Sequence, residues 1–204
     1  MKKWMAGLAA ALLCCCAATA TAELKFDISV FENNPNYKVE LDEMDDTGTI
    51  ELNAENTILG SLEDDNGAVV GSVDIVFIED MPPLMRVDLY YVGTEWVFTD
   101  NVILKLADRR YTFKVSRNTS VSGGMIYEAC AVVLTDESIQ LIKDMIDSNN
   151  FTVKMRLDGS KRKVDGSLDF DKEEVTRIYN DYVASGALEN DFSLIKTAFP
   201  CTIK

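Results

Sequence analysis

Apolar and polar residues alternate along much of the chain, and a period of two is typical of half-buried β-strands. A polar stretch that contains glycine, residues 61–71, interrupts this pattern. We interpret it as a loop, and the surrounding residues 60–71 as the best candidate for a sub-boundary. Before residue 94 we expect strands in five segments: 24–31, 37–41, 47–52, 72–78 and 84–93.

Residues 91–115 have the clearest pattern in the chain. Trp96 and Phe98 share one face, and apolar residues continue at every second position across 102–106. A tight turn at 107–110 leads into a second alternating run that ends at residue 115. We therefore predict a β-hairpin with one apolar face. We interpret Trp96 as a side chain that fills the core of the protein.

Farther along the chain the apolar positions change to spacings of three and four, which are typical of amphipathic helices. We expect two such helices, one on either side of a pair of strands. We expect a flexible link at 118–124 and then a strand at 125–134 that is buried on both faces. The first helix should run from Thr135 to about residue 148, and strands should follow at 151–157 and 163–170. The second helix should be capped by Asp171 and ended by Gly186.

Strands outnumber helices in this order, which predicts an α+β fold. We expect a mainly antiparallel sheet, sandwich-like in its N-terminal part, with two amphipathic helices near the C-terminus. The length suits a single domain, which we place at residues 23–204.

Residues 1–22 have the three-part layout of a secretory signal peptide. Lys2 and Lys3 give a positive start, residues 6–18 are apolar and uncharged, and small residues precede a cleavage point after Ala22. The apolar run is shorter than the roughly 20 residues that cross a bilayer. We therefore expect an extracytoplasmic chain, secreted or periplasmic, without a transmembrane helix once the signal is removed.

The five cysteines fall into two groups. Three of them, Cys14 to Cys16, lie in the expected signal. A lipid anchor there is the less favoured alternative, because Cys14 follows the large residue Leu13 and not a small one. Cys130 and Cys201 remain after cleavage. An oxidising compartment favours a disulfide between these two, and two buried free thiols are the alternative.

The charge of the chain is strongly negative, with 34 acidic and 20 basic residues and a net charge of −14. Removal of Lys2 and Lys3 with the signal makes this −16. Such a charge repels nucleic acids and anionic membrane surfaces, so we expect no nucleic-acid partner. Basic partners and divalent cations remain compatible. The simpler alternative is that the charge keeps an exported protein soluble.

The chain contains no histidine, which excludes Ser-His-Asp and Cys-His triads and every His-ligated zinc site. No glycine motif for phosphates or dinucleotides is present either. Paired carboxylates remain sufficient for glycoside hydrolysis, but the spacing singles out no pair. We therefore assign no catalytic residue and favour a protein that is not an enzyme.

Two sets of residues are candidates for binding a ligand. Asp64, Asp65 and Asn66 form an acidic loop that suits calcium, although the ligand order of an EF-hand is absent. A solvated charged loop is the alternative, and no other cofactor is expected. Trp96, with Tyr90 and Tyr91, is a candidate for stacking on a sugar ring or anchoring a partner.

The run Tyr91-x-Gly93-x-x-Trp96-x-Phe98 resembles a block in exported bacterial proteins of unknown function. In that group a hairpin, a strand-helix-strand segment, a short strand and a final helix follow the block. Val153-x-Met155-Arg156-x-x-Gly159 matches the second motif of that pattern, and the likeness covers roughly residues 87–184. The turn at 107–110 departs from the Asp-Gly that the group often carries. The resemblance implies the fold of this segment and assigns no functional residue.

These observations together favour an exported, non-enzymatic module that interacts with another protein or with a component of the cell envelope. A domain that binds a small ligand or a glycan through Trp96 is the alternative. A hydrolase that uses carboxylates is a third and weaker one.

Overall fold

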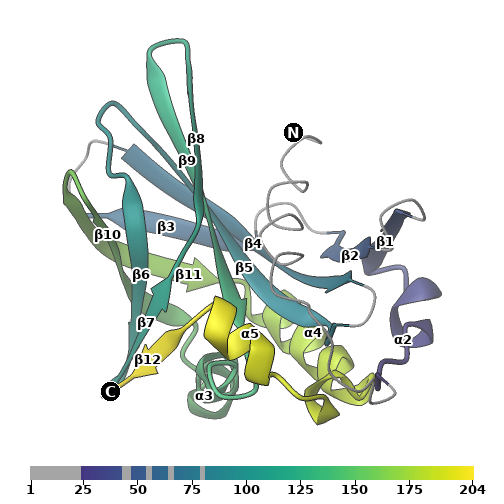
Figure 1. Cartoon of the computed structure of the whole chain (residues 1–204). Coiled ribbons are helices and arrows are strands. Elements are labelled where there is room, and N and C mark those ends of the chain that lie inside the picture. The colour runs from purple at the N-terminus through teal and green to yellow at the C-terminus, as the bar shows by residue number, and fades with distance from the viewer. Residues whose placement is uncertain (1–23, 43–46, 54–56, 64–66, 79–80) are drawn as a thin grey trace.

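The computed structural model describes residues 24–42, 47–53, 57–63, 67–78 and 81–204. The expected signal peptide and the candidate calcium ligands Asp64, Asp65 and Asn66 lie outside these ranges. Within them, twelve strands join one curled antiparallel sheet, and helices lie at its lower end in Figure 1. The predicted strand-rich α+β fold is confirmed.

All strand pairs in the described residues are antiparallel, and the spatial order is β12-β7-β6-β10-β11-β3-β4-β5-β9-β8. Strand β2 pairs with β4 next to β3, and β1 pairs with β2. The N-terminal strands therefore belong to the same sheet as the rest. The strands are β1 (Tyr37–Asp42), β2 (Thr47–Leu52), β3 (Ile58–Leu62), β4 (Gly67–Ile78), β5 (Leu84–Gly93), β6 (Thr99–Leu106), β7 (Arg109–Lys114), β8 (Arg117–Ser122), β9 (Met125–Leu134), β10 (Thr152–Gly159), β11 (Lys163–Phe170) and β12 (Cys201–Ile203).

The described helices are α2 (Ser29–Glu32), α3 (Gln140–Ser148), α4 (Lys172–Ala184), the 3-10 turn η1 (Ala187–Glu189) and α5 (Ser193–Ala198). Helix α4 begins as predicted, because the Asp171 carboxylate accepts the Glu174 N–H at 3.0 Å. It ends before Gly186, whose φ of 80° suits glycine. The two amphipathic helices expected near the C-terminus are therefore α3 and α4.

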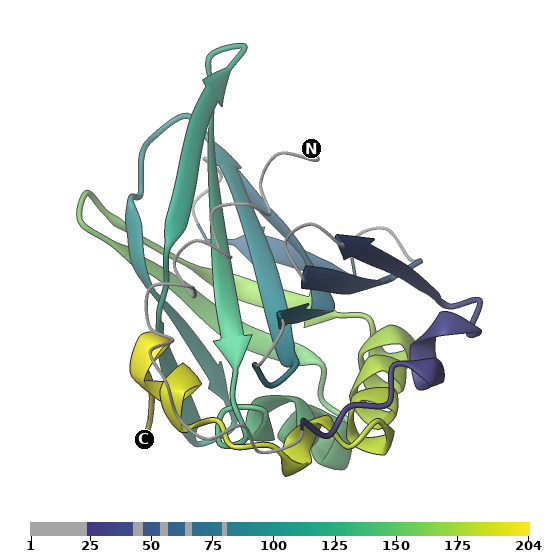
Figure 2. The same cartoon turned by 45° about the vertical axis from the view of Figure 1, so that its right-hand side comes forward.

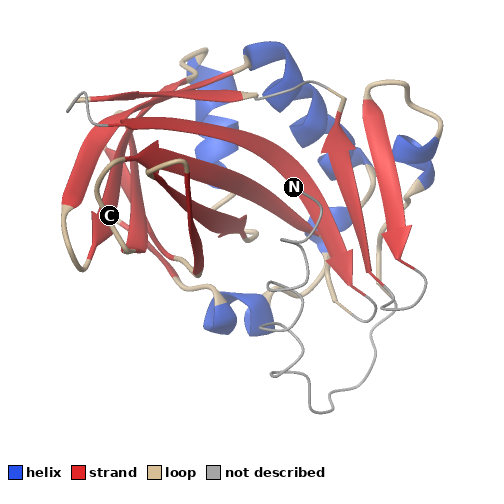
Figure 3. Cartoon of the chain, turned by 90° about the horizontal axis from the view of Figure 1, so that it is seen from above, coloured by secondary structure: helices blue, strands red, loops and turns tan. Residues whose placement is uncertain are grey.

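The main hydrophobic core lies inside the curl of the sheet, which Figure 3 shows from above. Alternate residues of most strands point into it, such as Val73 and Ile75 of β4. Helices α3 and α4 add their apolar stripes, with Ile142 and Ile178 fully buried. The buried Tyr182 keeps its hydroxyl bonded, donating to the Pro83 carbonyl at 2.7 Å. The hairpin predicted within residues 91–115 forms from β6 and β7, which contribute their apolar face to this core.

A smaller cluster covers one end of the opposite face of the sheet. There Ile78, Leu84 and Val133 pack against Phe192 and Ile195, which lie at the start of α5 and within it. The apolar C-terminal tail thus packs as expected. Figure 2 shows α5 beside the sheet and separate from α3 and α4.

Three local predictions are wrong. Residues 24–31 form no strand, because the Asp27 carboxylate accepts the Ser29 N–H and hydroxyl and closes a turn into α2. The supposed link 118–124 is mostly strand β8. The first late helix begins at Gln140 and not at Thr135, because Thr135 and Ser138 bond to each other and form a separate turn.

The polar stretch 61–71 contains more strand than predicted. Its two ends belong to β3 and β4, which pair with each other in the register Ile58↔Gly71 to Gly60↔Val69. Strand β3 had escaped prediction because its glycine and serine interrupt the apolar alternation.

Candidate functional site

The three aromatic residues singled out in the sequence occupy three different environments. Tyr90 is exposed on the outer face of β5, whereas Tyr91 is buried on the inner face, since successive residues of a strand point to opposite sides. Trp96 is half-buried in the connection between β5 and β6. The structure therefore does not join Tyr90 to the other two.

Tyr91 lies next to this connection, which we call the Trp96 bend (residues 94–98). Its hydroxyl donates to the Glu95 carbonyl at 3.2 Å and accepts from Arg162 at 3.2 Å. Arg162 also pairs with the Glu95 carboxylate at 2.6 Å. Tyr91 thus acts as a support for the bend and not as a surface aromatic.

The Trp96 bend is held by a buried carboxylate from another strand. Glu128 of β9 is only 1% exposed. Its two oxygens accept hydrogen bonds from the amides of Val97 (2.7 Å), Phe98 (2.8 Å) and Thr99 (3.1 Å), and from the Thr99 hydroxyl (3.3 Å). Several donors to one carboxylate offset the cost of burying its charge. The bend is therefore fixed in one conformation.

A second contact clamps the bend from the turn between β10 and β11. The Ser160 amide donates to the Phe98 carbonyl and the Lys161 amide to the Val97 carbonyl, both at 3.2 Å. Gly159 makes this approach feasible, because a β-carbon there would overlap the Val97 carbonyl oxygen. Phe98 itself has a φ of 53°, which is uncommon and strained for a residue of its size.

The side chains of the bend form a stack. The rings of Trp96 and Phe98 are parallel within 7°, with centroids 4.8 Å apart. The Arg117 guanidinium lies 5.3 Å from the centroid of the Phe98 ring, and it bonds to the Asp100 carboxylate at 2.7 Å and the Thr99 carbonyl at 3.2 Å. The shared face of Trp96 and Phe98 is confirmed. The core position predicted for Trp96 is wrong, because the left-handed Phe98 interrupts the strand and leaves Trp96 half-buried.

One residue in the sequence, Glu128, could have indicated this site. Glu128 is the only charged residue in the apolar run 125–134, and a lone carboxylate in a buried strand needs donors. Arg117 and Gly159 gave no comparable signal, because their roles depend on contacts between distant strands.

A second cluster of charge lies on the outer face of β4 and β5. Arg86 donates twice to the Asp74 carboxylate, at 3.1 and 2.8 Å, and pairs with Asp88 at 2.7 Å. Burial, followed by the nearby Asp74 carboxylate, raises the pKa of Asp88 to about 8, although Arg86 opposes this. Burial of the Asp88 carboxyl group is thus the main cause of its elevated proton affinity, and the like charge of Asp74 adds to it.

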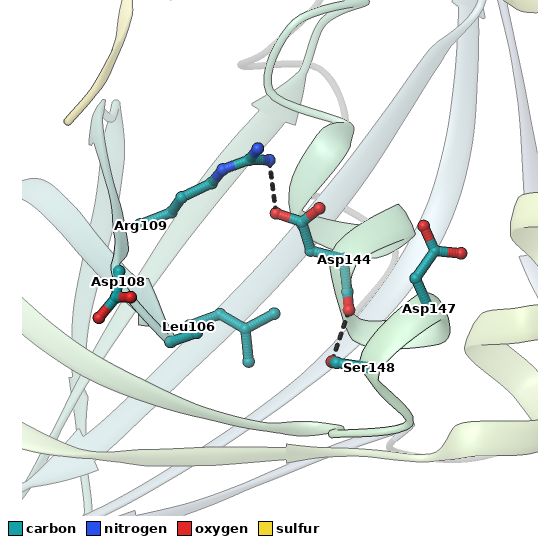
Figure 4. Close-up of a pocket in the computed structure, with 7 residues that line it drawn as sticks. Leu106, Asp108, Arg109, Asp144, Asp147 and Ser148 are labelled. Atoms are coloured by element: carbon teal, nitrogen blue, oxygen red, sulfur yellow. Dashed lines mark hydrogen bonds and ion pairs between the residues drawn. The ribbon is translucent and has the colours of Figure 1, made fainter.

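Figure 4 shows a pocket of about 450 Å³ between the β6–β7 turn and the end of α3. Arg109 reaches across it to the Asp144 carboxylate at 2.8 Å, which also accepts from Gln140 at 2.7 Å. The Ser148 hydroxyl donates to the Asp144 carbonyl at 2.6 Å. Because Arg109 and Asp144 are bonded to each other, we place the candidate site at the Trp96 bend and not here.

Cys130 and Cys201 form no disulfide in the structure, in contrast to the pairing predicted from the sequence. Cys130 is buried in β9, and Cys201 is half-buried in β12. Burial is the main cause that raises the pKa of both thiols to about 12. Each thiol therefore stays protonated and unreactive near neutral pH.

No group of three or more acidic or cysteine side chains in the described residues is arranged to hold a metal ion. None of the helices in the described ranges is long and apolar enough to cross a membrane. The chain matches no family model, no curated protein and no solved structure in the comparisons made with each.

Proposed function

We propose that the chain is an exported, non-enzymatic binding module that contacts another protein or an envelope component through the Trp96 bend. The observation that carries this proposal is the rigid presentation of a half-buried tryptophan. A buried carboxylate, a strained Phe98 and a glycine contact all fix the position of Trp96. Backbone strain and buried charge of this kind are retained where a particular geometry is needed.

The chemistry of the bend supports binding over catalysis. Its polar groups are bonded to one another: the Glu128 oxygens to backbone amides, and Arg117 to Asp100. Tryptophan and arginine are the side chains that contribute most at protein interfaces. The net charge of −14 favours a partner with a neutral or basic contact surface.

Photo-crosslinking in the native host tests this proposal. A benzoylphenylalanine placed at position 96 should give a reproducible adduct with one protein, identified by mass spectrometry. The matched control is the same probe at Val183, an exposed apolar residue of α4. The purified partner should then bind the wild type and lose affinity for a Trp96→Ala variant. Equal adducts from both positions, or none from position 96, would overturn the proposal.

A small-ligand or glycan site is the second candidate, since stacked aromatic rings also suit sugar rings. Trp96 is the only tryptophan after residue 22, so its fluorescence reports on the bend alone. A titration with soluble glycans should change this fluorescence if the second candidate holds. A silent panel, together with a protein adduct at position 96, supports the interaction module.

A further inference from the structure

Strand β8 forms a free edge of the sheet. In the part of the chain that the structure describes, it pairs with β9 and with no other strand. The β8–β9 hairpin extends beyond the rest of the sheet, as both Figure 1 and Figure 2 show. An edge of this kind presents unpaired backbone N–H and C=O groups in a row.

The turn of this hairpin identifies which backbone groups face outward. Gly123 and Gly124 have φ values of 59° and 81° and form a two-residue turn between Ser122 and Met125. Ser122 and Met125 are therefore the hydrogen-bonded pair that closes the hairpin. Hydrogen-bonded and non-hydrogen-bonded pairs alternate along antiparallel strands, so the backbone groups of Asn118 and Ser120 also bond to β9. The N–H and C=O groups of Arg117, Thr119 and Val121 consequently point away from it.

The side chains of β8 leave this edge accessible. The strand has the sequence Arg-Asn-Thr-Ser-Val-Ser, with no proline and no lysine to block pairing. Val121 is 61% exposed, and only Ser120 in the strand is half-buried. Residues 117–127 contain no carboxylate, although the chain as a whole carries a net charge of −14. Strand β8 and its turn therefore present no acidic side chain of their own to an approaching strand.

The edge begins at the Trp96 bend. Arg117 is the first residue of β8, and its guanidinium lies over the Phe98 ring and bonds to Asp100. A chain that pairs with β8 therefore runs toward the stack formed by Arg117, Phe98 and Trp96. The bend and the edge form one continuous surface.

We propose that β8 receives an extended segment of a partner protein, about six residues long, as an added antiparallel or parallel strand. A row of main-chain donors and acceptors is complementary to another main chain, so the occupant is a polypeptide. The overall charge favours a segment that is neutral or basic, and it opposes a second copy of this chain with the same charge. This inference rests on the proposed function and names the class of partner.

A library of random linear dodecapeptides on phage is the probe that tests this inference. Peptides selected on residues 23–204 are synthesised, and their affinities for the wild type and for four variants are measured. Thr119→Pro removes an outward N–H without removing a bond to β9, a position where an edge strand tolerates proline. It should weaken binding by at least about tenfold. The control Thr119→Ala keeps the amide and should change affinity by less than about twofold.

A second proline variant and a hydrogen-exchange measurement test strand addition without relying on Thr119→Pro alone. Val121→Pro removes the next outward amide and should weaken binding to a similar extent. Hydrogen exchange on the wild type should slow at the Thr119 and Val121 amides when peptide is present, and this needs no substitution. The fourth variant, Trp96→Ala, tests the adjoining bend.

The outcomes separate this inference from the proposed function. Loss of binding in Trp96→Ala, with both proline variants unaffected, overturns strand addition and retains the bend as the contact. A library that yields no binder, or peptides that leave exchange at Thr119 and Val121 unchanged, also overturns it. A concentration-dependent dimer of the wild type that Thr119→Pro abolishes would assign the edge to a second copy and not to a partner.

Discussion

The Glu128 carboxylate accepts the Val97 amide hydrogen bond at 2.7 Å, although the two residues are 31 positions apart. Strand β9 thereby determines the conformation of the connection between β5 and β6. The two strands pair directly, Tyr91 opposite Glu128, so the carboxylate lies beside the end of β5. The strained Phe98 and the half-buried Trp96 both depend on this contact.

Replacement of Glu128 by glutamine should destabilise the protein by about 3 kcal/mol, because a neutral amide loses charge-assisted bonds and turns donor hydrogens toward other donors. Urea unfolding measures this free energy. The fluorescence of Trp96 in the folded variant should also shift, since the bend relaxes. The exposed Glu189→Gln serves as control, and an equal effect of the two substitutions would show that Glu128 does not hold the bend.

Truncation of Trp96 should mainly reduce partner binding, whereas truncation of its neighbour Val97 should mainly reduce stability. Trp96→Ala should cost about 1 kcal/mol of stability, the value of an aromatic stack, and should remove partner binding. Val97→Ala should cost about 2 kcal/mol, because Val97 is fully buried, and should preserve binding in the folded fraction. Thermal unfolding and an affinity measurement on both variants check this pair. A larger stability loss for Trp96→Ala would mean that its role is structural.

The alternation of apolar and polar residues predicted those strands that have one buried and one exposed face. In β10, Val153, Met155 and Leu157 are buried and their neighbours are not, so the alternation was visible in the sequence. In β8 nearly all side chains are exposed, and a strand with two solvated faces has no apolar alternation. Its pairing with β9 is a property of the hairpin and not of its own composition.

The candidate site was predictable only in part. The sequence identified Trp96 and its shared face with Phe98, but assigned Trp96 to the core. The bend is created by Glu128 and Gly159, which reach it from strand β9 and the end of β10. No periodicity within residues 91–98 encodes those contacts, because the curl of the sheet brings them together.

Gly159→Ala should destabilise the protein by about 2 kcal/mol or more, because the added β-carbon overlaps the Val97 carbonyl oxygen, which belongs to the backbone. Gly124→Ala is the matched control. Its φ of 81° strains alanine by about 1 kcal/mol, but no atom lies near the new carbon. Urea unfolding should rank the two in that order. The reverse order would contradict the close contact between the β10–β11 turn and the bend.

The two thiols should be unreactive in the folded protein. Burial raises the pKa of Cys130 and Cys201 to about 12, so the reactive thiolate is scarce near neutral pH. A maleimide or Ellman reagent should label residues 23–204 slowly in buffer and rapidly at both positions in denaturant. If the protein isolated from its native host shows no thiol at Cys130 and Cys201 even when denatured, the disulfide expected from the sequence has formed.

The Asp74–Arg86–Asp88 cluster should make stability depend on pH. Asp88 has a pKa of about 8 in the folded chain and an ordinary value of 3.8. The folded state therefore binds a proton that the unfolded state has released between these values. Stability from this group is complete below about pH 4 and is lost as the pH rises through about 8.

Asp88→Asn tests whether stability falls with rising pH because of Asp88, since the amide resembles the protonated acid and does not titrate. Between about pH 5 and about pH 9, the variant should gain on the order of 4 kcal/mol of unfolding free energy relative to the wild type. The exposed Asp108→Asn should run parallel to the wild type over the same range. Parallel curves for Asp88→Asn as well would mean that Arg86 keeps Asp88 ionised and that desolvation does not dominate. An Asp74→Asn variant in the same urea series tests whether Asp74, whose pKa burial also raises, supplies the pH dependence instead.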